Sequence, residues 1–293
     1  DRTSKLLMIT LDRLGQRFRT GDLHRTFGRF KQFRSAYSFV QNSRQRLQPE
    51  HYRSQLSPRE TSNFDHIDPE DYAKNLRTKG VSFGFSLPPA AVAEVYRYAC
   101  ETPCTEPGQQ GEFYADDVQN GRLKGGRTVF RGLVKNPEHC RVVKLMAQDP
   151  VLLEVVRRYL HYWPTKLTFH LSWSFAVDMS EQEQREIYPP LNYHYDVAGY
   201  NFMTTYFYIT DIDADTGAHV MIERSHNQKP LNTLFTSGAD AQLAQQVLDY
   251  YGADSETVIE GKAGFGFVQD PSCFHRLSPL KKGRRLLLQI RYS

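Results

Sequence analysis

Residues 284–292, RRLLLQIRY, alternate between two kinds of side chain, so they indicate a β-strand with two distinct faces. One face is apolar after its first residue and suits burial against helices: Arg284, Leu286, Leu288 and Ile290. The other face is more polar and suits the interior of a barrel that holds a charged ligand: Arg285, Leu287, Gln289 and Arg291. Because a buried guanidinium is costly without an anion, Arg285 predicts an acidic ligand in that interior.

The same two-residue period begins at Lys166 and continues to the end of the chain. Many short strands separated by turns are typical of a barrel or a two-sheet jelly roll. The candidate strands are residues 166–177, 191–198, 202–210, 218–223, 257–260, 265–269, 272–276 and 284–292. With one further helix expected near residues 240–250, the predicted fold class is mainly β with flanking helices.

Helix signals dominate the part of the chain before Lys166. Residues 68–70, DPE, provide an N-cap, a proline at the first helical position and a first-turn acid, and Gly80 ends that helix. Residues 87–89, LPP, and 149–150, DP, open two more helices in the same way. A short strand is expected at residues 81–85. The Gly-rich segment 106–131 is expected to be irregular.

The N-terminal segment differs in charge from the rest of the chain. Residues 1–60 hold 13 Lys and Arg against 5 Asp and Glu, a charge of +8, whereas the remainder carries −4. Within it, residues 4–19 place Leu7, Leu11, Leu14 and Phe18 at helical spacing. We therefore expect a basic, partly helical extension over 1–66 and a main domain over 67–293. The extension either docks on the main domain or contacts an anionic surface such as a membrane.

Composition favours a globular protein in a reducing compartment. The chain has 293 residues, of which 40% are hydrophobic, and no apolar run approaches the ~20 residues that span a bilayer. The chain opens on Asp1 without a signal-peptide pattern. Its four cysteines form no C-x-x-C pair, so we interpret them as free thiols, with a zinc site at Cys100 and Cys104 as the alternative. The expected location is cytoplasmic, with peripheral membrane contact through the extension.

Residues 192–196, NYHYD, contain the first candidate metal ligands. Residues i and i+2 of a strand share a face, so His194 and Asp196 can hold one ion. A second imidazole is available from His275, in the segment 270–275. Two histidines and one carboxylate on one face leave about three octahedral positions open, as in non-haem iron(II) oxygenases. Each histidine by itself is also compatible with an ordinary hydrogen-bonded, half-buried residue.

Arg285 connects this metal site to an organic acid. It lies ten residues after His275, across a turn marked by Ser278-Pro279 and by residues 281–283, KKG. The remote carboxylate of 2-oxoglutarate supplies the anion that a buried Arg285 requires. Arg291 shares the face but lies six residues further along, about 20 Å away at ~3.3 Å per residue. We therefore expect Arg285 to bind this cosubstrate, and neither Arg284 nor Arg291.

With these residues assembled, residues 68–293 resemble the phytanoyl-CoA dioxygenase family of Fe(II)- and 2-oxoglutarate-dependent oxygenases. The resemblance rests on the order and spacing of several motifs: the capped helix and the GVSF turn at 80–83, HYD at 194–196, YITD at 208–211, TGA at 216–218, Ser225-His226, His275, Arg285 and Tyr292. Glu223-Arg224 departs from it, because the family usually has Pro-Gly before Ser-His.

The resemblance implies a double-stranded β-helix, a cupin-like jelly roll, with iron held by His194, Asp196 and His275. It implies 2-oxoglutarate on Arg285, with the hydroxyl of Thr204 beside that arginine, and a structural role for His226. The implied reaction consumes O2 and hydroxylates an unactivated C–H bond of a small molecule, with release of succinate and CO2. The carboxylate of Asp196 favours hydroxylation or desaturation over halogenation, since halogenases replace it with a small residue.

Two alternatives remain open from the residues alone. The R-x5-R spacing of Arg285 and Arg291 also appears in nucleic-acid demethylases of the same fold, and the N-terminal segment of this chain is basic. Nucleic acid is nevertheless not the expected partner. The same ligands could hold zinc, manganese or nickel in a cupin that is not an oxygenase. The substrate stays undetermined, with His170, Trp173, Tyr206 and the 106–131 loop as candidates for the pocket lining.

Overall fold

The computed structural model describes residues 23–230, 233 and 241–293, so the helix expected at residues 4–19 lies outside the described residues. Its helices are α2 (His24–Phe27), α3 (Lys31–Gln45), α4 (Pro49–Gln55), α5 (Pro69–Lys79), α6 (Pro89–Glu101), α7 (Arg141–Ala147), α8 (Pro150–Leu160), α9 (Glu181–Ile187) and α11 (Ala241–Tyr251). Its strands are β1 (Val81–Ser86), β2 (Cys104–Thr105), β3 (Glu112–Phe113), β4 (Arg131–Val134), β5 (Leu167–Phe175), β6 (Met203–Tyr208), β7 (His219–Ile222), β8 (Glu256–Ile259), β9 (Phe265–Gln269), β10 (His275–Leu277) and β11 (Arg284–Tyr292).

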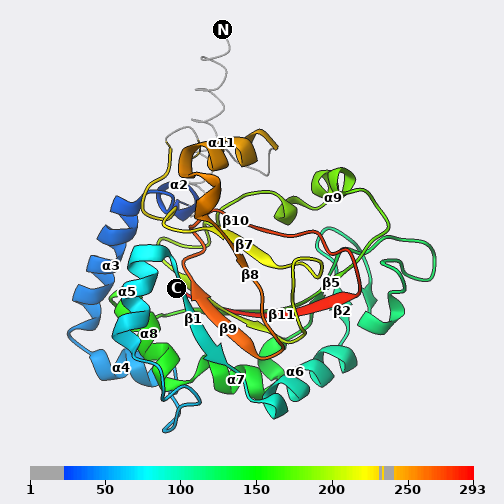
Figure 1. The fold of residues 1–293 in the computed structure, drawn as a ribbon. Coiled ribbons are helices and arrows are strands. Elements are labelled where there is room, and N and C mark those ends of the chain that lie inside the picture. Colours follow the sequence, from blue (N-terminus) through cyan, green and yellow to red (C-terminus); the bar gives the residue numbers. More distant parts are fainter. Residues whose placement is uncertain (1–22, 231–232, 234–240) are drawn as a thin grey trace.

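The strands form two antiparallel sheets that face each other, as in a jelly roll (Figure 1). The large sheet has the order β1-β9-β6-β11-β5-β4-β2-β3, and the small sheet has the order β10-β7-β8. Strand β11 lies between β5 and β6, and every residue from Arg284 to Tyr292 pairs with a residue of a neighbouring strand. The predicted fold class, mainly β with flanking helices, is confirmed.

The main hydrophobic core lies between the large sheet and a helical layer. Leu286, Leu288 and Ile290 of β11 pack in this core with Trp173 of β5 and with side chains from α5 to α8. Figure 1 shows these helices on the outer side of the large sheet. The face of β11 predicted to pack against helices therefore does so, and its other face points between the sheets.

The helix caps follow the sequence closely. Asp68 accepts a hydrogen bond from the N–H of Glu70, and α5 ends at Gly80, whose φ of 85° is left-handed and favours glycine. Asp149 accepts from the N–H groups of Val151 and Leu152 at the start of α8. These caps set the positions of two helices that cover the sheet.

The segment 106–131 is largely irregular, as predicted, with only β3 and a 3₁₀ turn at Ala115–Asp117 before β4 begins. Two local predictions are wrong. Residues 191–198 do not form a strand: a 3₁₀ turn covers Pro189–Leu191, and only His194 makes a β-bridge. Trp173 does not line a pocket, because strand alternation turns its side chain into the helical core.

Helix α3, from the predicted extension, packs against the main body. Gln45 at its C-terminal end exchanges two hydrogen bonds with the backbone of Trp163, of 2.8 and 2.7 Å. Tyr37 stacks on Tyr200, with ring centroids 5.1 Å apart. No helix in the described ranges is long and apolar enough to cross a membrane. The domain boundary near residue 66 stays a prediction.

Candidate metal centre

The three predicted metal ligands meet at one point between the sheets. His194, Asp196 and His275 each offer a ligand atom, and these atoms all lie within 4.8 Å of one another. His194 and His275 exchange two backbone hydrogen bonds, and the N–H of Asp196 donates to the carbonyl of Pro271 over 2.9 Å. A short antiparallel pairing, with no full strand around His194, therefore brings the two ligand segments together.

Both imidazoles have the same local hydrogen bond. Nδ1 of His194 lies 2.9 Å from the carbonyl of Asn192, and Nδ1 of His275 lies 2.9 Å from the carbonyl of Cys273. Because a carbonyl only accepts, each Nδ1–H donates and each Nε2 keeps a lone pair for a metal. Burial, and to a smaller extent the nearby His194, lower the pKa of His275 to about 4, so this imidazole is neutral at neutral pH.

The carboxylate of Asp196 is held from the other side by Arg291. The two groups form an ion pair of 2.7 Å. The alternation of residues 284–292 placed Arg291 on the same strand face as Arg285 but did not predict this ion pair. Burial by itself would raise the pKa of Asp196, but His275, Arg291 and His194 hold it below its ordinary value. Asp196 is therefore ionised and oriented before any metal binds.

Arg285 is a buried guanidinium with no acidic partner in the described part of the chain. Its exposed fraction is 2%, it donates to the carbonyl of Gly217 and to Oγ of Ser174 at 3.0 Å, and its Nε has no hydrogen-bond partner. Burial lowers the pKa of Arg285. A buried arginine whose only partners are neutral oxygens is suited to a ligand carboxylate.

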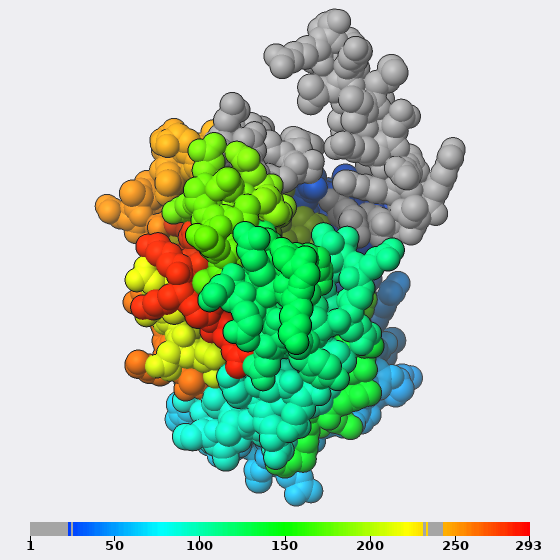
Figure 2. Space-filling model, turned by 90° about the vertical axis from the view of Figure 1, so that its right-hand side faces the viewer, coloured from blue at the N-terminus to red at the C-terminus, as the bar shows by residue number. Residues whose placement is uncertain are grey.

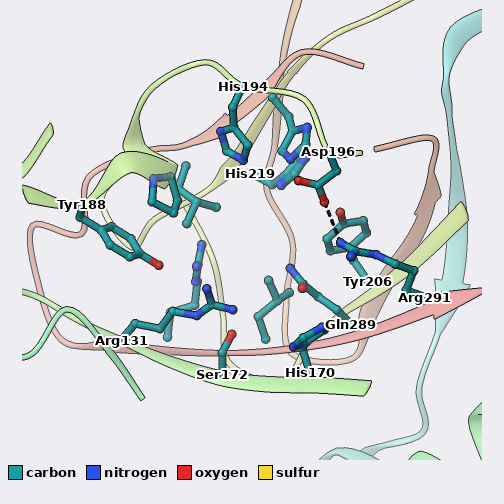
Figure 3. A pocket seen from close by; sticks show the side chains of 15 residues that line it. Arg131, His170, Ser172, Tyr188, His194, Asp196, Tyr206, His219, Gln289 and Arg291 are labelled. Carbon is teal, nitrogen blue, oxygen red and sulfur yellow. Dashed lines mark hydrogen bonds and ion pairs between the residues drawn. The ribbon is translucent and has the colours of Figure 1, made fainter. Parts of the chain in front are cut away.

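A second arginine, which sequence reasoning missed, lies beside Arg285. Arg131 on β4 and Arg285 on β11 both pair with Ser174 of β5, so the three residues form one row across the sheet. No hydrogen bond or ion pair of the Arg131 guanidinium occurs within residues 23–230, 233 and 241–293, and Figure 3 shows its side chain pointing into the cavity. Only strand pairing could reveal it, since 154 residues separate it from Arg285.

These groups line one cavity of about 310 Å³ (Figure 3). Among the described residues its lining includes three arginines and one carboxylate, so it attracts anions. His170 and Tyr206 line it as expected. The complete lining is Arg131, His170, Ser172, Tyr188, Pro190, His194, Asp196, Tyr206, His219, His275, Leu277, Arg285, Leu287, Gln289 and Arg291.

His219 is a further cavity residue that was not anticipated. It is buried on β7, and its ring stacks on that of His275 with centroids 5.3 Å apart. Burial holds the pKa of His219 well below its ordinary value, and its Nε2 has no hydrogen-bond partner. His219 is not one of the three clustered ligands, and it forms part of the wall behind His275.

Thr204 and His226, which were also named from the sequence, do not line this cavity. Thr204 pairs with Arg291 on β11, six residues along the strand from Arg285, and the hydroxyl beside Arg285 belongs to Ser174. Thr204 therefore does not lie beside Arg285 as the resemblance implied, because the register of β6 against β11 places Thr204 opposite Arg291. His226 contacts Sγ of Cys273 at 3.3 Å and the carbonyl of Arg77, which fits a structural role.

A second cavity, of about 410 Å³, adjoins the first and shares Arg131, Tyr188 and Pro190 with it. Its walls come from the 106–130 segment and from the residues around α9. Figure 2 shows these two segments, green and lime, next to each other on one face of the molecule.

Comparison with known proteins identifies the fold. No family model and no curated protein matches the sequence. Among solved structures, the non-haem α-ketoglutarate-dependent epimerase SnoN from nogalamycin biosynthesis aligns with 13% identity, a TM-score of 0.51 and coverage of 76% of this chain and 82% of that chain. The carbocyclase SnoK from the same biosynthesis aligns with 12% identity, a TM-score of 0.50 and coverage of 79% and 86%. The chain thus shares its fold with these two enzymes.

Proposed function

We propose that this protein is an Fe(II)- and 2-oxoglutarate-dependent dioxygenase that acts on a small molecule. The observation that carries the proposal is one cavity that holds both a two-histidine, one-carboxylate cluster and a buried arginine without an acidic partner among the described residues. This donor set suits iron(II) with open positions. The fold shared with SnoN and SnoK agrees with it.

The residues divide the work of binding. His194 and His275 would present Nε2 to the metal, because their Nδ1–H groups are already bonded to carbonyls. Asp196 would supply the third ligand while Arg291 fixes its second oxygen. Arg285 would hold the far carboxylate of 2-oxoglutarate, with Arg131 as a neighbouring positive charge. When bound, the iron and 2-oxoglutarate supply an oxidation that consumes O2 and releases succinate and CO2.

The proposed outcome is hydroxylation of an unactivated C–H bond, and the ligand set favours hydroxylation or desaturation over halogenation. Asp196 completes the cluster, so the position that a small residue would leave for a halide is filled. By contrast, neither the packing of α3 nor the similar structures support the membrane contact expected from the positive charge of residues 1–60. The proposed partner is a small molecule that enters beside Tyr188 and Pro190.

The test combines binding with turnover. Iron(II) is added to the metal-free protein without oxygen, and 2-oxoglutarate binding is followed by the charge-transfer absorption of its iron chelate. Aerobic incubation with small-molecule extracts should then form succinate together with a product that has gained one oxygen atom. Iron binding without affinity for 2-oxoglutarate would contradict the proposal and favour a metal-binding cupin.

A further inference from the structure

Helix α3 inserts a buried arginine, Arg34, into the main domain. The exposed fraction of Arg34 is 7%, and its guanidinium donates to three side chains of the main domain. Nε and Nη2 donate to Oδ1 of Asn201 at 3.2 and 2.8 Å, Nη2 donates to Oδ2 of Asp270 at 2.6 Å, and Nη1 donates to Oγ of Ser272.

These three acceptors lie in the two segments that carry the metal ligands. Asn201 lies five residues after Asp196, before β6 begins. Ser272 lies three residues before His275, in the connection between β9 and β10 that also contains Asp270. One planar guanidinium therefore links the segment after Asp196 to the segment before His275.

Both ends of this link are themselves anchored. Nδ2 of Asn201 donates to Oγ of Ser38, one turn further along α3, at 2.8 Å. Asp270 accepts a second hydrogen bond from the hydroxyl of Tyr159, and its other oxygen accepts from the N–H of Ser272 at 2.9 Å. The link thus has neighbours on α3, on α8 and in both ligand segments, and a shift of one member displaces the others.

Burial makes the link depend on Arg34. Asp270 is fully buried, and although burial raises its pKa, Arg34 holds that pKa well below the ordinary value. Within the described part of the chain, Arg34 is the only cation paired with Asp270. Without Arg34, a buried carboxylate loses its counter-charge, so the segment before His275 has to rearrange.

We propose that Arg34 is a positioning residue of the metal centre, which makes α3 part of the working site. It contacts no ligand directly, and it acts by holding the backbone on which Asp196 and His275 are mounted. Outer partners of this kind tune metal affinity because they set the orientation of the ligands. The inference rests on the proposed function only in that the three ligands bind a metal.

The experiment compares Arg34→Gln with two matched controls on the same helix. Arg44→Gln removes the same charge at an exposed position, and Gln45→Ala removes the contact of α3 with Trp163. The first readout, hydrogen exchange of the metal-free proteins over residues 194–203 and 270–276, needs no metal. The second is titration with Co(II), whose visible spectrum reports the arrangement of its ligands.

For Arg34→Gln we expect faster exchange in both segments, an altered Co(II) spectrum and about tenfold weaker Co(II) binding. Arg44→Gln should match the unmutated protein, and Gln45→Ala should lower stability without changing the spectrum. Unchanged exchange in Arg34→Gln, or the same spectral change in Gln45→Ala, would overturn the proposal.

Two further arms keep the result interpretable. If Arg34→Gln does not fold, the same measurements are made on Arg34→Lys. This variant keeps the positive charge beside Asp270 but lacks the planar set of donors that reaches both segments. An unaltered Co(II) spectrum in a folded Arg34→Lys would then count against the link. If the unmutated protein binds neither Co(II) nor Fe(II), the proposed function fails, and the exchange data still decide whether Arg34 holds the two segments.

Discussion

His194 and His275 exchange two backbone hydrogen bonds, of 3.0 and 2.8 Å, and their imidazole centroids lie 4.4 Å apart. Eighty-one positions separate the two histidines in the sequence, yet they are joined by an isolated β-bridge. This backbone pairing sets the distance between two of the three candidate ligands. The third, Asp196, lies two residues after His194 in the same segment.

We expect His194→Ala and His275→Ala each to reduce the amount of bound iron after anaerobic loading, because two ligands of a three-ligand site bind a divalent ion far more weakly. Metal analysis of the desalted proteins is the measurement. His226→Gln is the matched control, since His226 is buried nearby but contacts Cys273 and not the cluster. Full iron content in both alanine variants would show that the ligands are wrongly assigned.

Arg285→Gln should weaken 2-oxoglutarate binding by about tenfold or more, because the loss leaves a ligand carboxylate without its charge-assisted partner. Iron binding should change little, since Arg285 lies apart from the three ligands. Arg284→Gln serves as the control: that guanidinium bonds Asp116 and the hydroxyl of Tyr96 on the other side of β11. Titration of 2-oxoglutarate into the iron-loaded proteins measures both. A larger loss in Arg284→Gln than in Arg285→Gln would exclude this assignment.

Arg291→Met should make metal binding more sensitive to acid. Arg291 is one of the groups that hold the pKa of Asp196 below its ordinary value, so its removal raises that pKa and lets protons compete with the metal at higher pH. Co(II) affinity measured between neutral and acidic pH should show its midpoint displaced upward in the variant. A midpoint that does not move would mean that the ion pair has no influence on the ligand.

The metal-free protein should lose stability as the pH falls from about 6.5 towards 4. The pKa of His275 is about 4 and that of His219 lies well below its ordinary value, both chiefly because of burial. In this pH range these histidines bind protons in the unfolded chain but stay neutral in the folded chain, and this difference favours unfolding. Each such histidine contributes up to about 1.4 kcal/mol per pH unit.

Urea unfolding of the metal-free protein at several pH values measures this loss. His219→Gln removes one of the buried imidazoles, so its free energy of unfolding should depend less steeply on pH in the same window. The buried carboxylate of Asp270 does not interfere, because its pKa is lowered and its contribution is lost only at more acidic pH. An equal pH dependence in the two proteins would refute the role of His219.

Local sequence determined those features that depend on a repeating pattern or on a cap. The alternation of 284–292 assigned Leu286 to the helical core and Arg285 to the interior, because a strand turns successive side chains to opposite sides. The i, i+2 spacing brought His194 and Asp196 to one site, although residues 191–198 are not a strand. Asp68 and Asp149 marked helix starts because each side chain accepts a hydrogen bond from a backbone N–H in the first turn that follows it.

Tertiary structure alone decided which distant residues share the site. Strand order placed Arg131 beside Arg285, and the register of β6 placed Thr204 opposite Arg291. The docking of α3 brought Arg34 to Asp270, 236 positions away in the sequence. No local pattern encodes these pairings, since a buried arginine shows the same periodicity whether its partner is a carboxylate, a carbonyl or a ligand. The partner is set by strand order and helix packing, which depend on the burial of the whole core.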